Sequence, residues 1–278
     1  MHKLVRKIIR TLVELKLSWM ILSFFYKFFY RFKFEKDLIE IEKRATNLNL
    51  LEVKLKKIFS ELTVLHGPFK GMIYPDFMAY GSSLYPKLLG SYEAELNETI
   101  ERFLKNDYDS IIDVGCAEGY YAVGFAMRKP KAKVFAYDLN KDALVACKKM
   151  ATINKVGEQI EFGEFCSSET LANFKFKGKS LVISDCEGYE IDLFTPESVA
   201  NLTNCDVLIE LHDLYNEKIS PSIEAVFKNT HHITKVYSES TFKKMKNFKE
   251  SEPLTDVDIN SFMLERNGIM AWAIITPK

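Results

Sequence analysis

The residues best suited to chemistry form a short segment in the middle of the chain, where an apolar run ends in an acid and two glycines. The segment is Ile111–Gly119, with the sequence IIDVGCAEG. A buried strand that leads into glycines lets backbone N–H groups approach a ligand closely, and a helix expected to begin near Tyr120 adds the N–H groups of its first turn. This pattern is typical of a loop that binds a nucleotide cofactor.

The spacing of the glycines indicates which cofactor is bound. A dinucleotide fold usually has the pattern G-x-G-x-x-G, in which the third glycine lets the helix pack tightly on the strand. Here the pattern is Asp113-x-Gly115-x-x-x-Gly119, and two tyrosines follow it. This spacing suits S-adenosylmethionine better than NAD.

A second acid follows the next predicted strand. The run Ala132–Asp138 is a short strand that ends in a carboxylate, 19 residues after Gly119. A carboxylate at that strand end can accept hydrogen bonds from ribose hydroxyls, and Leu139 is placed to pack against adenine. Glycine turns also occur for steric reasons alone, but the acids at two strand ends favour binding. The predicted cofactor-binding residues are Asp113, Gly115, Cys116, Ala117, Gly119, Asp138 and Leu139.

With these motifs, the chain resembles the Rossmann-like (class I) S-adenosylmethionine-dependent methyltransferases over residues 90–278. Within that superfamily it is similar to the FkbM-type group, a similarity that three further segments carry. Gly90–Glu93 is similar to the segment that covers the cofactor, Asp185–Glu190 matches the pattern D-x-E-G-x-E, and Val207–His212 is similar to the family's fifth strand.

Apolar strands alternate with helical stretches from Tyr108 onward, which predicts a parallel sheet covered on both faces. The predicted strands are Ile111–Val114, Val134–Tyr137, Gln159–Phe162, Leu181–Ser184 and Val207–Leu211. Two later runs, His232–Tyr237 and Met270–Ile275, complete the sheet with an antiparallel edge, as the resemblance implies. The expected fold class is α/β, a Rossmann-like, doubly wound, mostly parallel sheet with an N-terminal helical extension.

Three regions are expected along the chain: a basic aromatic arm at 1–36, a helical and lid region at 37–107, and the methyltransferase domain at 108–278. Between residues 35 and 63 the apolar positions recur at helical spacing, which predicts an amphipathic helix. The segment from His66 to Tyr85 combines turn residues with several aromatic rings. A solvated connector has little use for so many rings, so a lid is favoured over a plain connector.

Methyl transfer is an in-line displacement at an activated carbon, so the enzyme mainly positions the acceptor and removes its proton. The acceptor is expected at the carboxyl ends of the fourth and fifth strands, where Asp185, Glu187 and His212 are the predicted catalytic residues. With an ordinary pKa of about 6.5, His212 is the best candidate for a general base; the alternative is a histidine that orients a neighbouring carboxylate. The same acids can hold a divalent cation, but their spacing is not specific for one, and the metal is left open.

The fourth strand lacks the N/D-P-P-[YF] motif of many methyltransferases that modify base or amide nitrogens, so a hydroxyl oxygen is the expected acceptor atom. The expected function is an S-adenosylmethionine-dependent O-methyltransferase of a sugar or a glycolipid precursor, where the acceptor rests on family analogy. A methyltransferase of a protein or a small metabolite is one alternative. A non-catalytic, membrane-associated scaffold that keeps the cofactor fold is another. Acids at three strand ends argue against the scaffold, because a fold that binds nothing has no need of them.

The net charge of zero hides an uneven distribution. Residues 1–36 hold nine Lys or Arg and two acids, a net charge of +7, which leaves −7 on the remainder. The body is therefore not expected to bind nucleic acid. Five cysteines are scattered without a C-x-x-C pair, which indicates a reducing, cytoplasmic compartment and no zinc site. Cys116 in the loop could be a nucleophile, but a small residue that fills the turn is the favoured interpretation.

The arm has no segment that spans a bilayer. Its uncharged run, Leu17–Tyr26, is shorter than the roughly 20 residues that a crossing needs, and a signal-peptide cleavage site is lacking. Its basic and aromatic residues favour docking at the anionic, cytoplasmic face of a membrane. Packing on the protein's own body or on a second subunit is the alternative, and the oligomeric state is not predicted.

Overall fold

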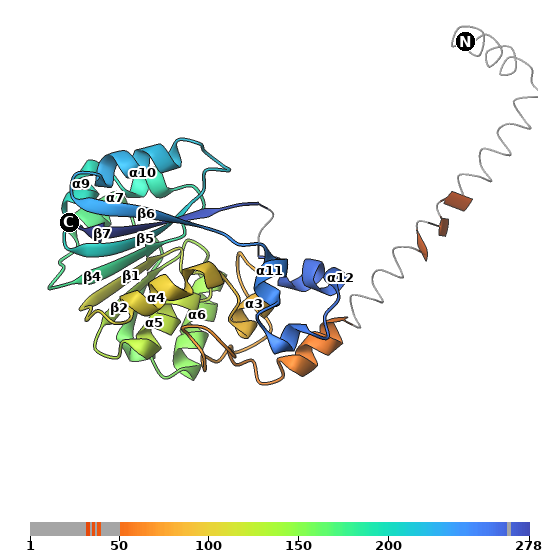
Figure 1. Cartoon of the computed structure of the whole chain (residues 1–278). Coiled ribbons are helices and arrows are strands. Elements are labelled where there is room, and N and C mark those ends of the chain that lie inside the picture. The colour runs from red at the N-terminus through yellow and green to blue at the C-terminus, as the bar shows by residue number, and fades with distance from the viewer. Residues whose placement is uncertain (1–31, 34, 37, 40–50, 266–267) are drawn as a thin grey trace, which may run out of the picture. The chain divides into compact units, whose positions relative to one another are not determined.

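The computed structural model describes residues 32–33, 35–36, 38–39, 51–265 and 268–278 (Figure 1). The chain divides into two compact units, Met1–Lys57 and Ile58–Lys278. In the first unit the described residues are helical. Apart from four residues near its end, the arm predicted at 1–36 lies outside the described part of the chain. Residues 37 and 40–50 of the amphipathic helix predicted between 35 and 63 also lie outside it. Among the residues described, no helix is long and apolar enough to cross a membrane.

The second unit is built on a seven-stranded sheet with the strand order β3-β2-β1-β4-β5-β7-β6. The strands are β1 Ser110–Val114, β2 Lys133–Tyr137, β3 Ile160–Gly163, β4 Ser180–Ser184, β5 Cys205–Leu211, β6 His231–Tyr237 and β7 Ala271–Pro277. β1 to β5 pair in parallel, with Asp113 opposite Ile183 and Ala136. The predicted doubly wound, mostly parallel sheet is confirmed.

The antiparallel strand lies at a different place from the predicted edge. β7 is antiparallel to both of its neighbours, β5 and β6, so the outermost strand β6 runs in the same direction as β5. The first five residues of β7, AWAII, are buried on both faces, whereas β6 carries exposed polar side chains along its length. A continuously apolar strand belongs inside a sheet and a partly polar strand at its edge, which accounts for this order.

Helices cover both faces of the sheet (Figure 1). One layer consists of α4 Asn97–Phe103, α5 Tyr120–Arg128 and α6 Lys141–Ile153, and the other of α7 Ser168–Asn173, α8 Glu190–Leu193, α9 Pro196–Ala200 and α10 Ile219–Phe227. Beyond the sheet lie α3 Leu84–Leu89, α11 Thr241–Met245 and α12 Asp256–Asp258, and the short turns are η1 Ala94–Leu96, η2 Gly157–Gln159, η3 Lys249–Ser251 and the π-helical η4 Ile259–Met263. This is the arrangement that alternating strands and helices predict.

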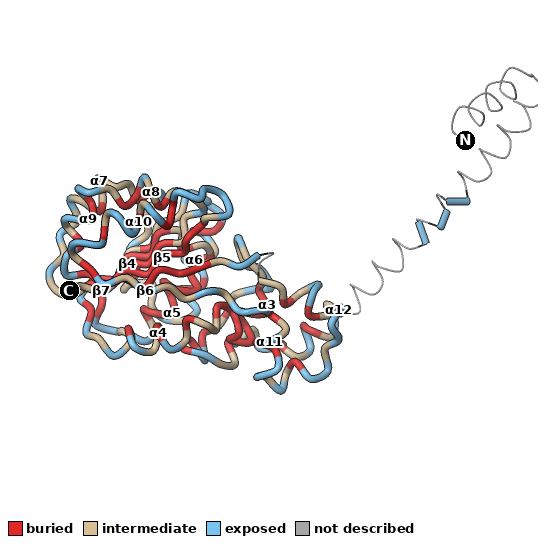
Figure 2. Tube along the Cα trace, turned by 45° about the horizontal axis from the view of Figure 1, so that its top comes forward, coloured by how far each residue is buried: buried red, intermediate tan, exposed pale blue. Residues whose placement is uncertain are grey.

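The core lies along the central strands, which are buried throughout (Figure 2). Val182 and Val207 are fully buried and pack in one cluster with Leu193 and Phe227 from the helices on one face. The apolar runs that predicted these strands therefore form the centre of the fold, and their carboxyl ends are held at fixed positions.

The segment between Ile58 and α3 packs on the other helical layer. Thr63 and Ile73 form an antiparallel bridge, and Phe69 between them inserts its ring against Tyr120 and Phe125 of α5, at centroid distances of 5.2 and 5.4 Å. A Cβ atom on Gly124 would lie 2.5 Å from the ring of Phe69. The absence of a side chain in α5 therefore makes room for this segment, which forms part of the same compact unit as the sheet.

Candidate active site

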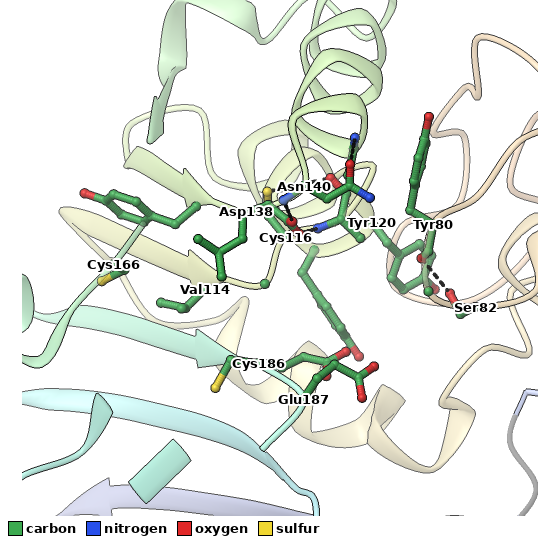
Figure 3. Close-up of a pocket in the computed structure, with 18 of the residues that line it drawn as sticks. Tyr80, Ser82, Val114, Cys116, Tyr120, Asp138, Asn140, Cys166, Cys186 and Glu187 are labelled. Atoms are coloured by element: carbon green, nitrogen blue, oxygen red, sulfur yellow. Dashed lines mark hydrogen bonds between the residues drawn. The ribbon is translucent and has the colours of Figure 1, made fainter. Parts of the chain in front are cut away.

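A cavity of about 420 Å³ opens at the carboxyl ends of β1, β2 and β4. Its wall includes Tyr80, Lys87, Tyr92, Val114, Gly115, Cys116, Ala117, Tyr120, Tyr121, Tyr137, Asp138, Leu139, Asn140, Asp185, Cys186, Glu187 and Tyr189. Figure 3 shows Cys116 and Asp138 on one side, and Cys186 and Glu187 across from them. The helices after β1 and β4 lie on opposite faces of the sheet, so the cavity lies at the crevice where doubly wound folds bind ligands.

The two glycines of the loop bring protein segments together as well as leaving room for a ligand. Gly115 has a φ of +85°, and a Cβ atom there would lie 1.8 Å from the backbone oxygen of Asp185. Gly119 has a φ of +101°, and a Cβ atom there would lie 2.6 Å from Sγ of Cys147 on α6. Gly115 lies in the cavity wall and Gly119 does not. Gly119 therefore acts through helix packing.

Asp138 links the two loops that border the cavity. Its Oδ2 accepts a hydrogen bond from the backbone N–H of Ala117 at 2.8 Å, and its Oδ1 accepts one from the N–H of Asn140 at 2.7 Å (Figure 3). Each carboxylate oxygen keeps a second lone pair that can accept from a ribose hydroxyl. Leu139, next to it, is 73% exposed and lies in the cavity wall, where it can cover an adenine face.

Asp113 is placed behind the cavity instead of in its wall. The carboxyl group is 1% exposed, and among the described residues none donates a hydrogen bond to its Oδ2. Burial, followed by the charge of Asp185, raises the pKa of Asp113 to about 8. A neutral carboxyl group beneath the start of α5 can shape the loop, but it does not reach the space that a cofactor would occupy.

Cys116 lies in the cavity wall but is poorly suited to be a nucleophile. Its side chain is 4% exposed. A hydrogen bond with Cys147, together with burial, raises the pKa of the Cys116 thiol well above its ordinary value. Because the thiolate is the reactive form, the structure favours the interpretation of Cys116 as a small residue that fills the turn.

The three predicted catalytic residues come together at the ends of β4 and β5. His212 is 2% exposed, and its Nε2 lies 3.5 Å from Oδ1 of Asp185, 3.5 Å from Oε2 of Glu187 and 3.6 Å from Oε2 of Glu210. On the opposite side of the ring, Nδ1 forms a 2.6 Å hydrogen bond with Oε1 of Glu190. Asp185 and Glu187 face the cavity, while His212 lies behind them.

The electrostatics of this group follow from burial and crowded carboxylates. Burial raises the pKa of Asp185 to about 6. For His212, burial alone would lower the pKa, but the hydrogen bond to Glu190 and the charges of Asp185 and Glu187 raise it above its ordinary value. With Nδ1 hydrogen-bonded to a carboxylate, a protonated ring donates from Nε2 toward the acids that face the cavity. His212 is thereby suited to orient Asp185 and Glu187.

Comparison with known proteins finds a family similarity for the segment that contains the Gly115–Gly119 loop. Residues 98–185 match the family described as methyltransferase small domain. This part of the chain is therefore similar to methyltransferases. A release factor glutamine methyltransferase of Chlorobaculum tepidum is 36% identical over 77 residues, which make up 26% of this chain and 26% of that protein. The match thus spans about a quarter of the curated relative's length.

Solved structures that align with the chain include an rRNA methylase from Streptococcus thermophilus. It is 11% identical, with a TM-score of 0.45, over 66% of this chain and 96% of that one. Another is an S-adenosylmethionine-dependent methyltransferase from Geobacter sulfurreducens in complex with S-adenosylhomocysteine. It is 13% identical, with a TM-score of 0.42, over 67% of this chain and 91% of that one.

The residues of the cavity wall fit S-adenosylmethionine, the cofactor that the sequence predicts. Asp138 and Leu139 border one part of the cavity, where the adenosine can lie, and the loop from Gly115 to Ala117 leads away from it. The rings of Tyr92, Tyr120 and Tyr121 lie in the wall beyond the loop. Ring faces attract a cationic sulfonium, so the remaining part of the wall suits the methionine moiety.

Asp185, Glu187 and His212 could also hold a divalent cation. Each offers one ligand atom, and these atoms lie within 4.8 Å of one another. Carboxylate oxygens combined with an imidazole nitrogen suit several divalent metals, so this ligand set is not specific for one metal.

The sequence prediction did not select several residues that shape the site. Glu190 ends the D-x-E-G-x-E segment but is not among the predicted catalytic residues, although it is 0% exposed and holds His212. The predicted site also lacks Glu118 of the loop, which is 2% exposed, and its partner Lys87, which lies 31 residues earlier. The acids inside the motifs were a usable signal. Lys87 offered none, because only the fold places α3 beside the loop.

Proposed function

We propose that the protein is an S-adenosylmethionine-dependent O-methyltransferase that acts on a hydroxyl group of a sugar or a glycolipid precursor. The observation that carries the proposal is the shared cavity, in which the loop around Gly115 and Asp138 faces Asp185 and Glu187. A cofactor held by the loop would direct its methyl group toward these acids. An acceptor hydroxyl bound beside them lies within reach of both a methyl donor and a proton acceptor.

The chain's own residues divide this work between the two acids and the histidine behind them. Asp185 lies in the cavity wall, and its Oδ1 is 3.5 Å from Nε2 of His212, so the histidine can hold this carboxylate while it takes the proton of an acceptor hydroxyl. Glu187 has a side chain that is 61% exposed, so it lies nearer the entrance and can contact the remainder of the acceptor. His212, held by Glu190, keeps both carboxylates in position. The cofactor supplies the activated methyl group.

An amide nitrogen acceptor is the alternative suggested by the name of the curated relative, a glutamine methyltransferase. In this chain β4 is followed by Asp185-Cys186-Glu187-Gly188, without the N/D-P-P-[YF] motif. Two acids beside the cavity are suited to remove a hydroxyl proton. An in-line attack by an amide nitrogen needs hydrogen-bond partners for both the N–H and the carbonyl, and the acids cannot donate to a carbonyl. We therefore favour oxygen.

The test is methyl transfer from labelled S-adenosylmethionine to separated fractions of glycans, lipids, proteins and small metabolites. We expect label in the glycan or the lipid fraction, in an alkali-stable ether linkage. Label in the protein or metabolite fraction would contradict the proposed sugar or glycolipid acceptor and assign a protein or a small metabolite instead. Cofactor binding without label in any fraction would support a non-catalytic scaffold. A parallel reaction with a chelator shows whether a divalent cation takes part, because transfer would then stop until metal is restored.

A further inference from the structure

We propose that Lys87 binds the carboxylate of the methionine moiety of S-adenosylmethionine. The inference deepens the proposed function and rests on it for the identity of the cofactor. Lys87 comes from α3, outside the matched methyltransferase domain, yet it lies in the wall of the same cavity as the glycine loop. Its side chain is 3% exposed, which is rare for a lysine unless it is paired.

The ammonium group of Lys87 is held in one position by the cofactor loop itself. Its Nζ lies 2.5 Å from Oε1 of Glu118, which is also buried. Glu118 is fixed in turn, because it accepts hydrogen bonds from the Tyr80 N–H at 2.9 Å and the Tyr74 hydroxyl at 3.3 Å. The lysine is thus a preorganised charge and not a flexible surface side chain.

The ammonium group of Lys87 has more hydrogen-bond donors than acceptors around it. A lysine ammonium has three N–H donors, and Glu118 accepts from one of them. The ring centroids of Tyr92 and Tyr120 lie 4.9 and 5.7 Å from Nζ and offer only their π-faces. Within the described part of the chain, Nζ has no second hydrogen-bond acceptor. A buried donor left without an acceptor is costly, so a ligand oxygen at this point would be strongly favoured.

Charge complementarity identifies that oxygen. S-adenosylmethionine carries a sulfonium, an ammonium and one carboxylate. Among the described residues of the cavity wall, Lys87 is the single base, beside the acids Asp138, Glu164, Asp185 and Glu187. The acids and the aromatic rings suit the two cationic groups of the cofactor, and the carboxylate is left with Lys87. A charge-assisted pair is stronger than a neutral hydrogen bond, so Lys87 would determine affinity for the amino-acid end.

The experiment compares two ligands that differ only in this carboxylate: S-adenosylmethionine and its decarboxylated form. Calorimetry measures both affinities for the whole chain and for Lys87→Met. We expect the variant to bind S-adenosylmethionine about tenfold to hundredfold more weakly. Its affinity for the decarboxylated ligand should stay within about twofold of the unchanged protein. Lys87→Arg should recover part of the loss, and Lys148→Met, an exposed lysine on α6, is the matched control.

Because Lys87→Met leaves Glu118 as an unpaired buried charge, a second variant, Lys87→Met with Glu118→Gln, removes both charges. The ratio of the two affinities within each variant is then independent of a general loss of folding. An equal loss for both ligands, or no loss for either, overturns the proposal and makes Lys87 a structural ion pair. If the unchanged protein binds neither ligand, the proposed function itself fails, which is a distinguishable result.

Discussion

The carboxylate of Asp138 accepts backbone hydrogen bonds from both loops that border the cavity. In Asp138→Ala these bonds are lost, together with those that we expect the carboxylate to form with the ribose hydroxyls. A charge-assisted hydrogen bond contributes about 1.5–3 kcal/mol, so affinity for S-adenosylmethionine should fall by about one to two decades. Calorimetry measures the change, with Asp142→Ala on the exposed start of α6 as the control. Unchanged binding in Asp138→Ala would contradict its assignment to the cofactor site.

His212 forms its tightest contact with Glu190, behind the acids that face the cavity. His212→Asn should lower kcat by about 10²–10⁴ while cofactor affinity stays close to that of the unchanged protein. Steady-state kinetics and calorimetry on the same preparation separate the two effects. The control is His232→Asn, which replaces an exposed histidine on β6. Full turnover in the variant would show that His212 acts neither as a base nor as a positioning residue in the reaction.

The buried carboxyl group of Asp113 makes stability depend on pH. Burial raises its pKa to about 8 from the ordinary 3.8, so the folded state favours the protonated form. This contribution is fully present below pH 3.8 and is lost as the pH rises toward 8. Between these values one proton changes the free energy of unfolding by at most about 1.4 kcal/mol per pH unit.

Asp113→Asn keeps the shape of the side chain and removes its titration. Urea unfolding between pH 5 and pH 8 should therefore show a decline in the unchanged protein that is weaker in the variant. The difference in unfolding free energy between the two should move in favour of Asn as the pH rises. A constant difference across this range would mean that Asp113 is ionised in the folded protein, contrary to its burial.

At the scale of elements, the turn after β1 depends on its close approach to the end of β4. In Gly115→Ala the new Cβ atom would collide with the backbone oxygen of Asp185 at a left-handed φ. The two strand ends would have to separate, which should lower the free energy of unfolding by about 3 kcal/mol and weaken cofactor binding. Gly157→Ala is the control, because its nearest neighbour would lie 4.0 Å away. Equal denaturation midpoints for the two variants would refute this account.

The elements that could be predicted are those whose signal is local. Apolar runs gave the strands of the sheet, and the glycine loop was placed correctly before α5, because burial and turn geometry act on neighbouring residues. Either β6 or β7 could have paired with β5, and β7 does so. No pattern within a single segment of the sequence indicates which of the two strands takes this place. The pairs Lys87–Glu118 and Glu190–His212 likewise join residues from separate elements.

Asp113 and Gly119 show the limit of motif reasoning at the site. Both belong to the pattern that predicted the cofactor loop, yet neither lies in the cavity wall. A motif records the residues that a loop needs in order to form as well as those that contact a ligand. Spacing alone does not separate the two groups, whereas burial and the positions of neighbouring side chains do.

At the scale of the whole molecule, the residues before 37 carry a charge of +7 and an aromatic run. We expect them to bind the anionic face of a membrane, where each Lys or Arg contributes about 1 kcal/mol and buried rings add to this. Co-sedimentation with vesicles measures the attachment. High salt should weaken it without abolishing it, because screening affects only the charges.

Two comparisons test this expectation. Anionic vesicles should pellet more protein than neutral ones, and the full chain should pellet more than a fragment that begins at Asp37. Equal pelleting in either comparison would leave the arm as an element that packs on the protein or on a second subunit. The proposed lipid-linked acceptor would then lose this support, although the cavity chemistry would be unaffected.

Glu118 has a consequence for the limits of the domain. It lies within the matched region, which begins at residue 98, but the groups that donate to it, Tyr74, Tyr80 and Lys87, all precede that region. A fragment cut at residue 98 would retain every residue of the glycine loop and expose a carboxylate shaped to receive three donors. The matched region, which begins at residue 98, is therefore too short to form the cavity wall by itself. A fragment that keeps the cavity intact must also contain the segment from Tyr74 to Lys87.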